Sequence, residues 1–93
     1  MSDSIRINPD VVFQTMEDEL VLLNMKTERY FGLDEVGADF WQIANRTTCL
    51  DQIVEELHTL YSVEKEQLAT DINALVKKLV ANNLIEIVPE HTD

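Results

Sequence analysis

A predicted strand runs directly into a predicted helix in the stretch Arg29-Tyr30-Phe31-Gly32-Leu33-Asp34-Glu35-Val36-Gly37-Ala38-Asp39-Phe40-Trp41. Its first five residues include adjacent aromatic side chains, which favour a strand, and Gly32, which marks a bend or the close approach of another backbone. Asp34 follows as a good helix N-cap, and Glu35 adds negative charge to the first turn. Trp41 has a large apolar area, which favours a place in the core. One helical face carries the apolar residues Val36, Phe40, Ile43 and Ala44.

Two further strands are predicted before this stretch. Residues 11–16 and 19–25 are rich in β-branched and apolar side chains, and a two-residue polar gap separates them. Such short connections imply an antiparallel meander of three strands. Residues 1–10 are polar and end in Asn8-Pro9-Asp10, so we expect a flexible N-terminal arm before a single domain at residues 11–88.

Two more helices are predicted in the second half of the chain, at about residues 50–60 and 64–83. The apolar residues of the longer helix span an arc of roughly 140°, wider than the ~100° that packing on one surface needs. Either this helix is buried on two sides by its own domain, or one edge lines a groove. That edge runs past Leu75 and is bordered by Asp71 and Lys78. The sequence leaves both interpretations open.

A short final strand is predicted at residues 84–88, where Pro89 stops it, and residues 89–93 are expected to form a flexible tail. The order of elements is thus three strands, three helices and a last strand. This order predicts an α+β domain that resembles a winged helix-turn-helix and contains a three-stranded antiparallel sheet.

Charge and composition argue against several kinds of partner. The 93 residues include 18 Asp and Glu but 7 Lys and Arg, a formal net charge of −11. Nucleic-acid affinity rests largely on cationic contacts, so we expect no nucleic-acid partner, and anionic membranes are repelled in the same way. No apolar run approaches the roughly 20 residues that cross a bilayer, and the N-terminus lacks a signal region. The single cysteine fits a reducing compartment, so we expect a cytoplasmic protein.

No reaction centre is predicted. The sequence has no Cys-x-x-Cys or His-x-x-x-His pair, and His58 and His91 are far apart. The two glycines, Gly32 and Gly37, are too few for a phosphate-binding loop. Carboxylates are abundant but lie on predicted polar faces without the spacing of a catalytic pair. We therefore expect no metal, no cofactor and no enzymatic activity.

The residues at 22–25 and 29–41 resemble those of the PqqD-like recognition elements for ribosomally synthesised precursor peptides. The similarity is greatest to the stand-alone leader-binding B proteins of lasso-peptide clusters. Those proteins carry an aromatic-aromatic-Gly-Leu segment, then Val-Gly, then a helix with Trp. The corresponding residues here are Tyr30-Phe31-Gly32-Leu33, Val36-Gly37 and Trp41. Similar spacing continues through Asp71-Ile72, Leu75, Leu79 and Leu84-Ile85.

This resemblance implies that the chain binds a leader peptide. The leader would add as a strand beside residues 29–33 and rest against the helix at 64–83, a mode in which main-chain bonds give affinity and pockets give selectivity. The implied partners are a precursor peptide and a leader peptidase or other modifying enzyme of lasso-peptide biosynthesis. The implied peptide-binding residues are Arg29, Tyr30, Phe31, Leu68, Asp71, Ile72, Leu75 and Lys78.

Three alternatives remain. One is a subunit or regulator that binds some other protein through the same edge strand. A PqqD-type peptide chaperone for a radical SAM enzyme of quinone-cofactor biosynthesis would share the fold, but the Tyr-Phe-Gly-Leu run is more typical of the lasso branch. A winged-helix DNA-binding regulator would also share it. Charge argues against the regulator, because the helix at 64–83 has few cations to set against its acids. Its cations are Lys65, Lys77 and Lys78, and the acids are Glu64, Glu66 and Asp71.

Overall fold

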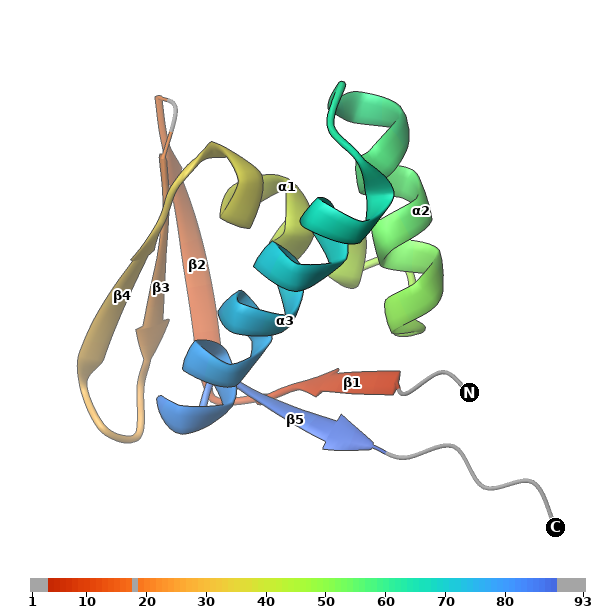
Figure 1. Cartoon of the computed structure of the whole chain (residues 1–93). Helices are drawn as coiled ribbons and strands as arrows, with labels where there is room; N and C mark the ends of the chain where they lie inside the picture. Colours follow the sequence, from red (N-terminus) through yellow and green to blue (C-terminus); the bar gives the residue numbers. More distant parts are fainter. Residues whose placement is uncertain (1–3, 18, 89–93) are drawn as a thin grey trace, which may run out of the picture.

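Strands dominate the first third of the chain and helices the remainder in the computed structural model, which describes residues 4–17 and 19–88. The elements are β1 (Ser4–Ile7), β2 (Val11–Met16), β3 (Glu19–Asn24), β4 (Arg29–Leu33), α1 (Glu35–Ala44), α2 (Leu50–Leu60), α3 (Lys65–Ala81) and β5 (Ile85–Val88). The predicted α+β order is confirmed, with β1 as an addition. Figure 1 shows β2, β3 and β4 beside the helices, and β1 next to β5.

The strands β2, β3 and β4 form the predicted antiparallel meander, with β3 in the centre. Leu20 and Leu22 of β3 are fully buried, so one face of the sheet packs on the helices. At the end of β3, the buried Asn24 accepts hydrogen bonds from main-chain N–H groups of the following turn. Its amide donates to the Asn83 carbonyl at 3.1 Å, which ties the sheet to the residues just after α3.

Residues 4–7 form β1 and are not the flexible arm that the sequence predicted. β1 pairs antiparallel with β5, and Ile5 lies opposite Ile87. Ile5 is buried, and its N–H donates to the Thr48 carbonyl at 2.8 Å. Burial of this side chain and the main-chain bonds offset the loss of chain entropy that ordering a terminus costs. The expected tail at residues 89–93 lies outside the described residues.

The three helices share one buried core. Trp41 of α1, which was predicted to lie in the core, is buried together with Ile53 and Leu57 of α2. At the end of α2, the Tyr61 hydroxyl donates a hydrogen bond to the Asp39 carboxylate of α1. Desolvation and the neighbouring Asp39 raise the pKa of Tyr61 above its usual range. The side of α3 that faces this core carries Leu68, Ile72, Val76 and Leu79.

Candidate functional site

The outer edge of β4 is the first component of the candidate site. β4 pairs with β3 along one side, and no other strand in residues 4–17 or 19–88 pairs with it. The main-chain N–H and C=O groups along its other side therefore face no ladder partner within the described chain. Such an edge is a template for an added strand.

The side chains of β4 alternate between two faces of the sheet. Arg29, Phe31 and Leu33 lie opposite Asn24, Leu22 and Leu20, on the face that packs against the helices. Tyr30 and Gly32 point to the opposite, outer face. Tyr30 is 74% exposed there. Of the three β4 residues predicted to bind peptide, Arg29 and Phe31 therefore share the face of α3, and Tyr30 does not.

A hollow of about 270 Å³ begins where β4 ends and separates the start of α1 from α3. We name it the strand-side hollow; its lining residues are Asp34, Val36, Gly37, Asp71, Ile72, Ala74, Leu75 and Lys78. Four of the five α3 residues predicted to bind peptide thus lie together. The fifth, Leu68, is 3% exposed in the core and does not line the hollow. The helix therefore buries one face and lines a groove with the adjacent edge.

Four lining residues were not predicted as site residues: Asp34, Val36, Gly37 and Ala74. Asp34 is the N-cap of α1, as predicted, and its Oδ1 accepts a hydrogen bond from the Gly37 N–H at 2.9 Å. A Cβ on Gly37 would lie 3.1 Å from the side chain of Leu33, so glycine allows α1 to start close to β4. Asp34, Val36 and Gly37 follow β4 directly in the sequence. This position was the signal that could have identified them, since the wall of such a site begins where the strand ends.

Charged groups mark the two ends of this groove. Asp71 lies nearer the start of α3, and its side chain and that of Asp34, which also lines the hollow, are exposed. Lys78 lies two helical turns beyond Asp71, about 10 Å along the axis. Arg29 lies near the same end as Lys78, because it pairs with Asn24, whose amide bonds to Asn83 just after α3. The half-buried side chains of Val36 and Leu75 form an apolar floor between the acidic end and the basic end.

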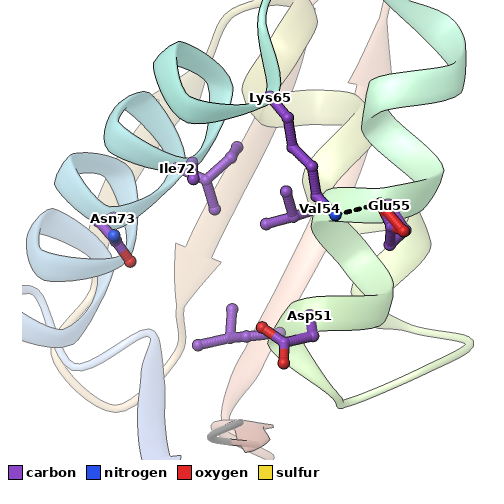
Figure 2. Close-up of a pocket in the computed structure, with 8 residues that line it drawn as sticks. Asp51, Val54, Glu55, Lys65, Ile72 and Asn73 are labelled. Atoms are coloured by element: carbon purple, nitrogen blue, oxygen red, sulfur yellow. Dashed lines mark ion pairs between the residues drawn. The ribbon is translucent and has the colours of Figure 1, made fainter. Parts of the chain in front are cut away.

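A second hollow, of about 560 Å³, lies on the other side of α3, between α3 and α2. We name it the helix-side hollow. Figure 2 shows Lys65 at the start of α3 reaching toward Glu55 of α2, and their charged groups are 2.6 Å apart. This hydrogen bond and the charge of Lys65 lower the pKa of Glu55. The residues that line the helix-side hollow all belong to α2 or α3, so this hollow offers no strand edge to which a guest strand could pair.

The described residues offer little else that is chemically distinctive. Among them, no three or more His, Cys, Asp or Glu side chains are grouped to hold a metal ion. None of the helices in this part of the chain is long and apolar enough to cross a membrane. The site is thus a strand edge with an adjoining hollow, an arrangement that can bind an extended peptide.

Comparison with known proteins gives one family and two solved structures that resemble this chain. The family of coenzyme PQQ synthesis protein D (PqqD) matches residues 19–85. No curated protein matches the chain significantly. A solved structure described as TbiB1 in complex with the TbiA(beta) leader peptide is 31% identical, with a TM-score of 0.82 over 95% of this chain and 99% of that one. Lasso peptide synthetase B1 complexed with the leader peptide is 24% identical, with a TM-score of 0.79 over 89% of this chain and 98% of that one, and shows the fold alone.

Proposed function

The chain belongs to the PqqD family, and on this basis we propose that it is a non-catalytic domain that binds the leader segment of a ribosomally synthesised precursor peptide. The bound segment, here named the guest strand, pairs with the outer edge of β4. The observation that carries this proposal is the position of the strand-side hollow, which begins at the residue that follows that edge.

Each part of the site has a separate role in this mechanism. The main-chain groups of β4 hold the guest strand by ladder hydrogen bonds, which are largely independent of the guest's sequence. Alternate guest side chains then point to the helix face, where Phe31 and Leu75 offer apolar surface. Asp71 and Lys78 at the two ends favour guests with complementary charges, through exposed and therefore weak ion pairs. Affinity comes from the strand and selectivity from the groove.

The proposed role of the bound complex is presentation. A leader held as an extended strand has a fixed direction and exposes the segment that follows it to an enzyme. We infer that this enzyme is a leader peptidase or another modifying enzyme of lasso-peptide biosynthesis, in the cytoplasm, because the 31% identical neighbour is a leader-peptide complex. The domain itself then needs no catalytic group.

A second candidate is favoured by the description of the matching family, which is a protein of coenzyme PQQ synthesis. In that case the domain would hold its peptide for a radical SAM enzyme of quinone-cofactor biosynthesis. The two candidates share the guest-strand site and differ in the enzyme that joins the complex. Co-purification of the peptide-loaded domain with a peptidase or with a radical SAM enzyme distinguishes them.

Titration of the isotope-labelled domain tests the proposal directly. The probes are the TbiA(beta) leader peptide and the leader of any precursor peptide found to be encoded beside the gene of this chain. We expect a dissociation constant of micromolar or below, about −8 kcal/mol, with amide shifts concentrated on β4 and α3. If both leaders leave the β4 amides unshifted at millimolar concentration, the proposal is wrong. Salt-sensitive affinity for duplex DNA would instead favour a regulator.

A further inference from the structure

Gly32 is the fourth of the five residues of β4, and no contact in the described chain requires a glycine there. A glycine within a strand weakens it, because the backbone is freer when unfolded and no side chain packs. None of the glycines in the described chain has positive φ, and a Cβ on Gly32 would meet no atom within 4 Å. Gly37 differs, since a Cβ there would crowd Leu33. The described chain would therefore accommodate a Cβ at position 32 without a clash.

The missing side chain leaves open space above Gly32 at the free edge of the outer face, and we name this space the notch. Gly32 pairs with Val21 of β3, which in turn pairs with Gln14 of β2, so the three residues form one row across the sheet. Val21 is half-buried and does not pack against the core cluster, which places it on the outer face. Tyr30, two residues before Gly32, points to that same face and is largely exposed. The notch thus has Val21 as its floor and Tyr30 on one side.

We propose that Gly32 leaves space for a large apolar side chain of the guest strand, which lies across β4 against Val21 and Tyr30. This inference rests on the proposed function, because the notch opens toward the position of the guest strand. Residues opposite each other on antiparallel strands have Cβ atoms only ~4.5–5.5 Å apart, within reach of a large side chain. A guest side chain that leans across β4 would therefore fill the open space above Gly32 that a side chain at position 32 would otherwise take. A large side chain that covers a glycine on the neighbouring strand is a favourable cross-strand pair.

Two consequences follow for recognition. The guest strand is recognised on both faces of the sheet: its inward side chains contact the strand-side hollow, and one outward side chain fills the notch. Gly32 also acts in opposite directions on folding and on binding. A β-branched residue would strengthen the free strand, because it has a higher strand propensity than glycine and its Cβ would clash with nothing, and it would weaken guest binding.

The test uses Gly32→Val with Gln14→Val as a matched control in the same row at the opposite edge. The probe is the tightest peptide selected on the wild-type domain from a display library. We expect Gly32→Val to raise the melting temperature and to weaken this peptide about tenfold or more, and Gly32→Ala to weaken it less. Gln14→Val should bind as the wild type does. Replacing one outward, large apolar guest residue by Ala should weaken binding to the wild type but not to Gly32→Val.

Three results would contradict either the role of Gly32 or the proposed function. Equal affinity of the wild type, Gly32→Val and Gly32→Ala for the selected peptide would disprove the role of Gly32 and leave the proposed function standing. The role of Gly32 would also be disproved if Gly32→Val lost affinity but every guest residue replaced by Ala had the same effect on the variant as on the wild type. If no selected peptide shifts the amides of β4 in the wild type, the proposed function itself fails.

Discussion

The two outer strands of the sheet, β2 and β4, flank the same central strand and differ in their surroundings. Leu22 of β3 lies between Phe13 of β2 and Phe31 of β4, so the two phenylalanines occupy matched positions on one face. Phe13 is 48% exposed, whereas Phe31 packs against the core. β4 also contacts α1 and leads to the strand-side hollow, while β3 is the main neighbour of β2.

Exposed apolar side chains alone would select the wrong strand. β2 exposes Val12, Phe13 and Met16, and β4 exposes only Tyr30 to a comparable degree among the described residues. A strand edge becomes a selective peptide site where pockets accompany its main-chain groups, and those pockets lie next to β4. We therefore expect changes around β4 to impair peptide binding and matched changes elsewhere to leave it intact.

The largest effect is expected from Leu75→Asp, which puts a charge into the strand-side hollow that distinguishes β4 from β2. Leu75 is half-buried against the core, and a carboxylate there would lose solvent when the guest strand covers it. Peptide affinity should fall about thirtyfold, or ~2 kcal/mol. Calorimetric titration with a leader peptide measures this loss.

Val80→Asp is the control for this substitution, because Val80 is exposed on the other side of α3. Circular dichroism must show that both variants retain the helical content of the wild type. If folded Leu75→Asp binds the leader as tightly as Val80→Asp does, the hollow takes no part in recognition. The hollow would then give no reason to prefer β4 over β2 as the peptide-binding strand.

A smaller effect is expected from the matched pair Phe31→Ala and Phe13→Ala. Phe31 faces the groove beside the free edge of β4, so truncation removes apolar surface that the guest strand would cover. Affinity should fall about tenfold for Phe31→Ala, or ~1.4 kcal/mol, and remain unchanged for Phe13→Ala. Comparable losses in both variants would mean that the guest strand does not discriminate between the two edges.

Much of this asymmetry was predictable from the sequence. The 29–41 stretch predicted the strand, the Asp34 cap and the buried Trp41, because local pairing, capping and periodicity are encoded within a few residues. The wide apolar arc of the last helix left open whether the helix is buried on two sides or lines a groove with one edge. The structure supports the groove, because Asp71, Leu75 and Lys78 line a hollow. Amphipathic periodicity identifies which residues share a helix face, and that information survives folding.

Other features depended on contacts that a local pattern does not contain. β1 forms because Ile5 meets β5 some eighty residues later, and the short Ser-Ile-Arg-Ile alternation was its only local sign. The face on which Tyr30 lies depends on the register of β4 against β3, since a shift by one residue would reverse it. Leu68 lies on the apolar arc like its neighbours, but the packing of α3 buries it.

A pH effect on stability should follow from the contact between α1 and the end of α2. The Tyr61–Asp39 bond holds α1 to the end of α2, and the folded state raises the pKa of Tyr61. Below about pH 10 both folded and unfolded states are protonated at this residue, so its contribution to stability is complete. At higher pH the unfolded state releases the proton first, and stability falls. Denaturant unfolding between about pH 9 and 11 should show a steeper loss for the wild type than for Tyr61→Phe; parallel curves would contradict this account.

The smallest effect is expected from the neighbouring lysines Lys77 and Lys78. Lys78 lines the strand-side hollow, whereas Lys77 faces the α2 and β5 side of the same helix. Both ammonium groups are exposed, so Lys78→Ala should weaken peptide binding only about two- to fivefold, with a difference that shrinks as salt increases. Lys77→Ala should have no effect at any salt concentration, because its charge lies across α3 from the guest strand. Equal, salt-dependent losses in both variants would show that the peptide responds to the total charge of α3, and the side of the helix next to β4 would then have no special electrostatic role.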